Sequence, residues 1–273
     1  MVKVKHIFSD MDGTLLNSQG QVSLENANLI KNSKIPFTLV SARAPFEMEN
    51  AIQILGLNDL QIGFNGGLIF KKQDAKYHVI QSFPIPYQTV IDICKLIKQD
   101  FKQVTPSIYD LNNWYAEKID SSIQVEINIT HFKPTITNNL VDLIVKKHMD
   151  IYKIMFIVLD PTLLDKLYKV LADKFDNVMI QRSGTQYLEI TSRDAYKSKG
   201  INYILEKEKL NKQEVAAFGD SHNDVSMLDL VGYPIAMGNA QDEIKKMAKY
   251  ITKSNDENGV GYGIKHFLVE NDD

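Results

Sequence analysis

The chain has 273 residues, of which 44% are hydrophobic, and it carries 31 basic and 34 acidic side chains for a formal net charge of −3. This length and apolar content can bury the core of one large or two modest domains. The balanced charge gives no general attraction to nucleic acid. A single cysteine excludes internal disulfides, and no apolar run reaches the ~18 residues of a membrane span. We therefore expect a cytoplasmic protein that binds neither nucleic acid nor a membrane.

The first strand signal, from Val4 to Ser9, is followed by two carboxylates one residue apart in an Asp-Met-Asp-Gly-Thr string. Successive strand side chains alternate, so Asp10 and Asp12 leave the backbone on the same side and can converge. A divalent cation between them, or a proton on one of them, relieves their repulsion. Gly13 permits a sharp turn here, and the Thr14 hydroxyl can hydrogen-bond back to the site.

A second acidic cluster follows another short apolar strand, Val215 to Gly219, and contains Asp220 and Asp224. If this strand and the first are parallel neighbours, both clusters gather at the carboxyl edge of one sheet, where α/β folds hold their ligands. Mg²⁺ is the natural occupant, because it prefers oxygen ligands and is usually held by one or two carboxylates plus substrate phosphate. The two clusters together predict a magnesium site.

These clusters resemble the motifs of haloacid dehalogenase superfamily phosphatases, and in particular the Cof-type branch with a large cap domain. The resemblance spans nearly the whole chain. It implies that Asp10 is the nucleophile that forms an aspartyl-phosphate, and that Asp12 is the general acid and base. It also implies a metal site in which the Asp10 side chain, the Asp12 backbone carbonyl and Asp220 hold Mg²⁺. In the same resemblance Asp224 orients metal-bound waters and Asn223 contacts the phosphate.

The second motif of this family is a serine or threonine at the end of a strand. The predicted strand from Phe37 to Ser41 ends in Ser41, which the resemblance assigns as a hydroxyl and amide donor to phosphate oxygens. Ala42 stands where glycine is common, and we expect it to contact the phosphate together with Met11. Arg43 can pair bidentately with the phosphoryl group or with the rest of the substrate, the alternative being a solvated surface arginine.

The family also requires a lysine that compensates the charge of nucleophile and phosphate. Lys197 fits the distance from the predicted strand at Tyr187 to Ile190, and a helix from Ile201 would follow it. Lys199 is the alternative, because the Lys199-Gly200 pair mimics the family's usual Lys-Gly sequence better. We favour Lys197 as the catalytic and phosphate-binding lysine.

Two further strings deepen the resemblance. A glycine-rich turn at Asn65-Gly66-Gly67 predicts a hairpin that leads into the cap. Near the C-terminus, the string Ala236 to Ala240, which contains Asn239, resembles the Cof-type signature.

The strand and helix signals predict an α/β fold with a doubly wound, mostly parallel, Rossmann-like sheet and an inserted α+β cap domain. The core comprises residues 1–82 and 188–273, and the cap comprises residues 83–187. Cap helices are expected at residues 87–98, 137–148 and 161–171, and cap strands at residues 123–130, 153–159, 177–182 and 187–190.

Together these features predict a Mg²⁺-dependent phosphatase that hydrolyses small phosphorylated metabolites, for which the family suggests sugar phosphates. A phosphotransferase or phosphomutase would use the same aspartyl-phosphate, and a non-enzymatic sensor of phosphorylated metabolites is a further alternative. For the cap aromatics Tyr109, Trp114 and Tyr115 we favour burial in the cap core over a place beside the substrate. The sequence does not indicate an oligomeric state.

Overall fold

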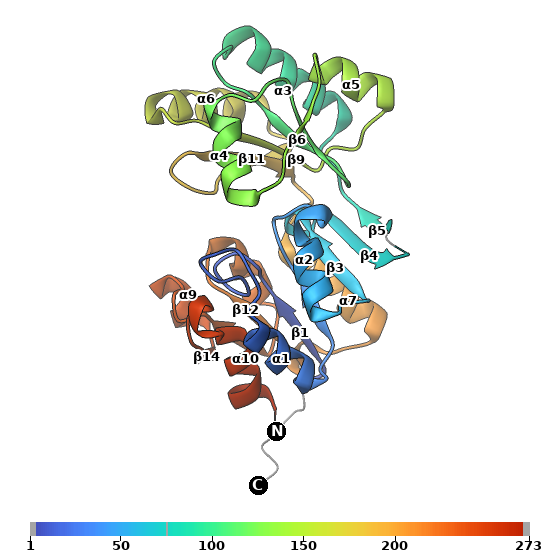
Figure 1. The fold of residues 1–273 in the computed structure, drawn as a ribbon, viewed down its shortest axis with the longest axis vertical. Helices are drawn as coiled ribbons and strands as arrows, with labels where there is room; N and C mark the ends of the chain where they lie inside the picture. Colours follow the sequence, from blue (N-terminus) through green and yellow to red (C-terminus); the bar gives the residue numbers. More distant parts are fainter. Residues whose placement is uncertain (1–3, 75, 270–273) are drawn as a thin grey trace. The chain divides into compact units, whose positions relative to one another are not determined.

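The computed structural model describes residues 4–74 and 76–269, which form two compact units (Figure 1). The first unit, the core unit, contains the described residues up to Arg43, Met48–Gln81 and those from Tyr196 onward. The second, the cap unit, contains Ala44–Glu47 and Ser82–Ala195. The ends of the predicted core segments, residues 1–3 and 270–273, lie outside the described residues. Within the described ranges, no helix is long and apolar enough to cross a membrane.

The core unit is built on a sheet of five parallel strands in the order β14-β13-β12-β1-β2. These strands are β1 (His6–Ser9), β2 (Phe37–Leu39), β12 (Val215–Gly219), β13 (Tyr233–Ala236) and β14 (Tyr250–Ile251). Strands β1, β2 and β12 are buried throughout, as expected for parallel strands covered on both faces. The predicted parallel α/β sheet is therefore confirmed.

Helices and a smaller sheet complete the core unit. A parallel bridge from Val40 to Ile62 leads to a second sheet of order β3-β4-β5, in which β3 and β4 are antiparallel. Its strands are β3 (Leu60–Gly63), β4 (Leu68–Gln73) and β5 (Lys76–Ser82), and the predicted Asn-Gly turn lies between β3 and β4. The helices are α1 (Leu24–Ser33), α2 (Pro45–Leu55), α7 (Lys197–Glu208), α8 (Val225–Leu228), α9 (Asp242–Met247) and α10 (Gly259–Gly263).

The order of strands creates a switch point between β1 and β12. From β1 the chain passes through α1 to β2 on one side, whereas from β12 it passes through α8 to β13 on the other. The connections therefore diverge at the carboxyl ends of the two strands, which is the position where doubly wound sheets bind ligands. Both acidic clusters of the sequence follow these two strands.

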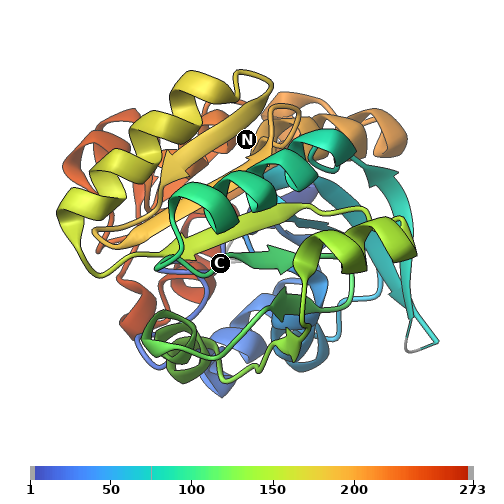
Figure 2. The ribbon, with the colours of Figure 1, turned by 90° about the horizontal axis from the view of Figure 1, so that it is seen from above.

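The cap unit is an α+β structure with a six-stranded sheet of order β10-β11-β9-β6-β7-β8. Helices α3, α5 and α6 cross one face of this sheet (Figure 2) and bury a core of aliphatic and aromatic side chains against it. The strands are β6 (Ser107–Tyr109), β7 (Trp114–Ala116), β8 (Thr135–Ile136), β9 (Lys153–Ile157), β10 (Val178–Arg182) and β11 (Tyr187–Ser192). The helices are α3 (Tyr87–Asp100), α4 (Ser121–Thr130), α5 (Leu140–Lys147) and α6 (Pro161–Lys174).

The predicted strand at residues 123–130 is wrong, because this segment is helix α4, Ser121–Thr130. The alternation of isoleucine and valine with polar residues suggested a strand. However, the Asp120 side chain accepts hydrogen bonds from the amides of Ser122 and Ile123 and so caps a helix start. Ile123 and Glu126, three residues apart, are buried on one helical face, which shows that burial follows the helical period.

A buried hydrogen-bond chain links β1, β2, β3 and α7. The Thr38 hydroxyl donates to the Leu60 carbonyl at 3.0 Å, so it accepts from the His6 Nε2 hydrogen at 2.9 Å. The other ring nitrogen of His6, Nδ1, lies 2.8 Å from a carboxylate oxygen of Glu208. Because His6 and Thr38 are both buried, removing one partner leaves a polar group that water cannot reach.

We expect Thr38→Val to lower the free energy of unfolding by about 1–3 kcal/mol, the cost of leaving a buried polar group unpaired. Urea unfolding followed by circular dichroism measures this change. Thr38→Ser keeps the hydroxyl and should retain most of the stability. Equal unfolding midpoints for the valine variant and the wild type would show that this hydrogen-bond chain contributes nothing to stability.

Candidate active site

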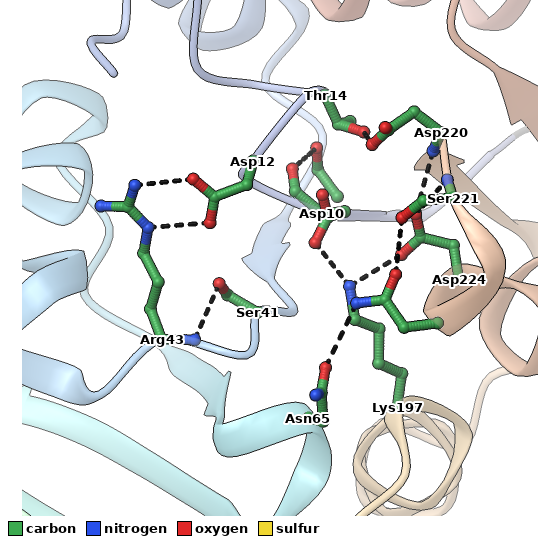
Figure 3. Close-up of polar contacts among 12 residues, drawn as sticks. Asp10, Asp12, Thr14, Ser41, Arg43, Asn65, Lys197, Asp220, Ser221 and Asp224 are labelled. Atoms are coloured by element: carbon green, nitrogen blue, oxygen red, sulfur yellow. Dashed lines mark hydrogen bonds and ion pairs between the residues drawn. The ribbon is translucent and has the colours of Figure 1, made fainter. Parts of the chain in front are cut away.

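Asp10 and Asp220 follow the two central strands and lie at the same sheet edge (Figure 3). Ser9 pairs with Phe218 in the register of β1 and β12, and the Asp10 amide donates to the Phe218 carbonyl at 3.0 Å. The alignment of these strands therefore brings together two carboxylates that lie far apart in the sequence.

Lys197 connects Asp10 to Asp224. Its Nζ donates to Oδ1 of Asp10 at 2.5 Å and to Oδ1 of Asp224 at 2.7 Å. All three side chains are buried, and Lys197 is only 1% exposed. The alternative, Lys199, instead places its Nζ 5.8 Å from the centre of the Tyr196 ring. The structure thus brings Lys197, and not Lys199, to the carboxylate cluster.

Gly66 sets the position of the helix that begins with Lys197. A Cβ atom on Gly66 would lie 2.2 Å from the Tyr196 carbonyl oxygen, and its φ of +96° also favours glycine. The neighbouring Asn65, whose φ is +55°, accepts a 3.4 Å hydrogen bond from the side-chain amide of Asn223. The Asn-Gly turn therefore contacts both the lysine helix and the second acidic loop, a role that the sequence pattern did not indicate.

Gly13 and Thr14 shape the pocket around Asp220. The Thr14 hydroxyl donates to Oδ1 of Asp220 at 2.8 Å, as the hydroxyl in the first motif led us to expect. Gly13 has a φ of +78°, and a Cβ there would lie 2.6 Å from Oδ2 of Asp220. Its carbonyl accepts a 2.8 Å hydrogen bond from the Asn239 side chain, so the C-terminal signature braces this loop.

Asp10, Asp220 and Asp224 form a cluster that fits a divalent cation. Each offers a carboxylate oxygen, and these oxygens lie within 4.8 Å of one another. Lys197 takes one oxygen of Asp10, and Thr14 takes one of Asp220, so Asp10 and Asp220 each have a second oxygen to offer. Hard oxygen donors of this kind suit Mg²⁺.

Asp224 is placed to orient the cluster rather than to bind directly. Its Oδ1 accepts from Lys197, and its Oδ2 accepts from the amides of Asp220 and Ser221 at 2.9 and 3.1 Å. Every oxygen of this fully buried carboxylate is therefore already hydrogen-bonded. The arrangement suits the predicted role of Asp224 as a group that positions the site around the metal.

Burial shifts the pKa values of these groups. It raises the pKa of Asp10 well above its usual range, and although Lys197 opposes this, Asp224 and Asp12 add to it. Burial also raises the pKa of Asp220 to about 6. For Lys197, burial alone would lower the pKa, but Asp10 and Asp224 outweigh it and raise the value. The cluster thus holds more negative charge than one ammonium can compensate, which favours a bound cation.

Asp12 points away from the cluster and pairs with Arg43 (Figure 3). The guanidinium donates from Nε to Oδ2 at 2.8 Å and from Nη2 to Oδ1 at 2.6 Å. The Asp12 side chain is 59% exposed, so water screens this pair and it contributes little to stability. A phosphate dianion can therefore compete for Arg43. The carboxylate of Asp12 is not part of the metal cluster, which leaves only its backbone carbonyl for the predicted ligand role.

The prediction that Ser41 donates through its amide is wrong, because that amide hydrogen-bonds to the Ile62 carbonyl at 2.9 Å. This bond continues the link between the two sheets. The Ser41 hydroxyl accepts from the Arg43 amide at 3.1 Å and keeps its own hydrogen to donate. Met11 is 1% exposed, so a phosphate contact there would have to come from its backbone; Ala42 is half-buried.

The described residues thus form a parallel α/β core sheet with a carboxylate cluster at its switch point and an inserted α+β unit. The sequence profile of the haloacid dehalogenase-like hydrolases matches residues 7–264. The chain belongs to this family, which confirms the resemblance seen in the sequence.

Related proteins match nearly the full length of the chain. Phosphatase YwpJ of Bacillus subtilis is 28% identical, over 97% of this chain and 100% of the relative. A second Bacillus subtilis protein, 5-amino-6-(5-phospho-D-ribitylamino)uracil phosphatase YwtE, is 27% identical over 97% of this chain and 98% of the relative. The crystal structure of a haloacid dehalogenase-like hydrolase from Bacteroides thetaiotaomicron superposes with a TM-score of 0.87 at 26% identity, covering 96% and 99% of the two chains.

We expect Asp220→Asn to stabilise the cation-free protein, and to do so more at pH 7.5 than at pH 5. The folded-state pKa of Asp220 is about 6, above the unfolded value, so the folded state favours the protonated side chain. The contribution of this side chain to the free energy of unfolding is fully present below the unfolded pKa and is lost as the pH rises through 6. Thermal melts in EDTA at the two pH values measure the difference.

We expect Mg²⁺ to raise the melting temperature of the wild type, and the same variant should lose that rise. Asp12→Asn is the control, because its carboxylate lies outside the cluster, and it should keep that rise. An Asp220→Asn protein that Mg²⁺ stabilises as much as the wild type would remove Asp220 from the metal site.

We expect Lys197→Met to lower both catalytic efficiency and stability. Its removal leaves two buried carboxylates without their counter-charge, at a cost of about 3–5 kcal/mol. Lys199→Met is the matched control and should remain close to the wild type in both respects. Steady-state kinetics and urea unfolding test the pair, and a larger loss of activity for the Lys199 variant would reverse the assignment.

Proposed function

We propose that the protein is a Mg²⁺-dependent phosphatase that hydrolyses small phosphorylated metabolites through an aspartyl-phosphate on Asp10. The observation that carries this proposal is the buried triad of Asp10, Lys197 and Asp224 with Asp220 beside it. A nucleophilic carboxylate stands here next to a fixed ammonium and a cation site, the two features that an incoming phosphate dianion requires. The phosphatase names of the relatives support the same reaction class.

In the first step, a carboxylate oxygen of Asp10 attacks phosphorus. The bond between phosphorus and the ester oxygen of the substrate breaks, and the aspartyl-phosphate forms. Lys197 holds Asp10 in place and offsets negative charge on the phosphoryl oxygens, while Ser41 donates its hydroxyl hydrogen to one of them. When bound, Mg²⁺ would be held by Asp10, Asp220 and the Asp12 carbonyl, and would neutralise charge between nucleophile and phosphate.

Asp12 supplies the proton transfers. Once its pair with Arg43 exchanges for contacts with the substrate, Asp12 can take up a proton from solvent and give it to the leaving alkoxide in the first step. In the second step it accepts a proton from water, whose oxygen attacks phosphorus and releases Asp10 and inorganic phosphate. Covalent catalysis thereby divides one displacement into two easier ones. Met11, Ala42 and Asn223 are proposed to complete the phosphate contacts through backbone and amide groups.

The proposed substrates are small phosphate monoesters, sugar phosphates in particular. A relative named for a phosphorylated ribityl compound supports a phosphorylated polyol as a substrate type. We propose that residues 1–82 and 188–273 perform the chemistry and that residues 83–187 select the substrate.

We expect Asp10→Asn to abolish turnover, because an amide cannot form the phosphoenzyme. Asp12→Ala should lower kcat by on the order of 10²–10⁴, the usual contribution of a positioned acid and base. Phosphate release across a panel of phosphorylated metabolites, with Mg²⁺ and with EDTA, measures both variants.

The panel is run in ¹⁸O-labelled water so that hydrolysis is distinguished from transfer. Label in the released phosphate indicates hydrolysis, whereas phosphate found on an added sugar hydroxyl indicates a phosphotransferase. Full turnover by Asp10→Asn, with deamidation excluded by mass spectrometry, would refute the mechanism.

A further inference from the structure

The cap unit contains a cavity of about 370 Å³, which we call the cap cavity. It is lined by α3, the loop that follows α3, the segment after β7 and the first residue of α5. Protein interiors are close-packed, with few voids larger than a water molecule, whereas ligand sites are mostly apolar cavities of about 300–1,000 Å³. The cap cavity therefore has the size of a ligand site.

The inner wall of the cap cavity is apolar. Its side chains are buried members of the hydrophobic core of the cap unit, and they include Cys94, Ile97, Val104 and Leu140. Tyr115 belongs to the same core, as predicted from the sequence. An apolar group that enters the cavity would leave water for this wall, which is favourable in proportion to the apolar area removed from water.

Helix α3 places apolar and charged groups side by side at the cavity. Cys94 and Ile97 are three positions apart and Lys98 is four positions after Cys94, spacings that put side chains on one side of a helix. Cys94 and Ile97 are buried, whereas Lys98 is exposed. The side of α3 that lines the cavity therefore changes from apolar in the interior to cationic at the solvent.

Lysines mark the open side of the cap cavity. Lys98, Lys102 and Lys118 line it, and all three are exposed to solvent. The Lys118 ammonium is 3.8 Å from a carboxylate oxygen of Asp120, but Lys98 and Lys102 form no ion pair with any described residue. Like charges at one opening repel one another, and an anion between them relieves that repulsion. The opening therefore favours a negatively charged group.

Glu117 is the carboxylate among the residues that line the cavity. Its Oε1 accepts a 2.9 Å hydrogen bond from the Leu140 amide at the start of α5, where the helix dipole favours negative charge. Burial, and to a lesser degree Glu117, raise the pKa of the Cys94 thiol to about 12, so the thiol is neutral. An anionic group near Cys94 would meet the Glu117 carboxylate, whereas an apolar chain would not.

We propose that the cap cavity binds a small amphipathic anion, namely a monocarboxylate with an apolar chain of medium length. The carboxylate lies at the opening, within reach of Lys98 and Lys102, and the chain lies inside against the apolar wall. This site is independent of the proposed phosphatase reaction, because every residue that lines it belongs to the cap unit. The cap unit thus has a ligand of its own, distinct from a phosphate ester.

Octanoate is the probe, and isothermal titration calorimetry of the full-length protein measures its binding. Octan-1-ol has the same chain without the charge, and acetate has the charge without the chain. Each should bind at least tenfold more weakly than octanoate. Octan-1-ol binding as tightly as octanoate would refute the role of the lysines, and equally tight acetate would indicate an adventitious ion only. No heat of binding from octanoate would refute the whole proposal.

The double variant Lys98→Met/Lys102→Met removes two charges at the opening. It should weaken octanoate binding by roughly tenfold, because each exposed ion pair contributes up to about fivefold in affinity. Lys95→Met/Lys147→Met is the matched control, since these exposed lysines of α3 and α5 are not among the residues that line the cavity. The control should bind octanoate within twofold of the wild type. Equal weakening by both variants would show that only net charge matters, contrary to the proposal.

Cys94 is the single cysteine of the chain and locates the bound octanoate. Cys94→Leu fills part of the cavity and should abolish binding, whereas Cys94→Ala leaves the cavity open and should bind within threefold of the wild type. Saturating octanoate should also slow the reaction of wild-type Cys94 with methyl methanethiosulfonate at least fivefold, as followed by mass spectrometry. This second measurement decides the matter if Cys94→Leu does not fold. Unchanged binding by a folded Cys94→Leu variant, or an unchanged rate of thiol reaction, would place octanoate elsewhere and overturn the proposal.

Discussion

A single buried ammonium between two buried carboxylates is the constraint on which the core site depends. Lys197 contacts Asp10 and Asp224, yet Asp220 lies within the same cluster, so one positive charge faces three carboxylates. Excess like charge in a desolvated place is unfavourable, and a raised pKa on Asp10 and Asp220 is its direct expression. The imbalance also prepares the site for its proposed ligands, because a divalent cation relieves the repulsion and then attracts a phosphate dianion.

Such a cluster persists only if the surrounding backbone holds it in place. Gly13 makes room for the Asp220 carboxylate, and Gly66 allows the turn after β3 to meet the start of the lysine helix. A third glycine, Gly219, would place a Cβ 2.6 Å from the Asp224 Cβ atom. A larger side chain at Gly13 or Gly219 would displace the side chain of Asp220 or Asp224, and one at Gly66 would displace the Tyr196 backbone, which directly precedes Lys197. The glycines therefore affect the reaction by fixing the positions of the site residues, because misplacement of a reacting group by about 1 Å can lower the rate by a large factor.

The core site could be predicted from the sequence because its residues follow strands whose apolar runs are easy to recognise. Asp10, Asp220 and Asp224 were placed correctly at one sheet edge by the rule that parallel strands end together. The pairing of Asp12 with Arg43 could not be predicted, because it depends on the orientation of two partly exposed side chains. The hydrogen bond from the Ser41 amide to the Ile62 carbonyl also could not be predicted, because the bridge between the two sheets is a long-range contact.

The cap was harder to predict because its strands are short and their pairing is non-local. Strands β6 and β7 have three residues each, too few to show an alternation, and α4 carries a strand-like pattern that its Asp120 cap overrides. The pairing of β6 with β9, for example, joins segments that are distant in the sequence, and no local pattern in either strand specifies that register.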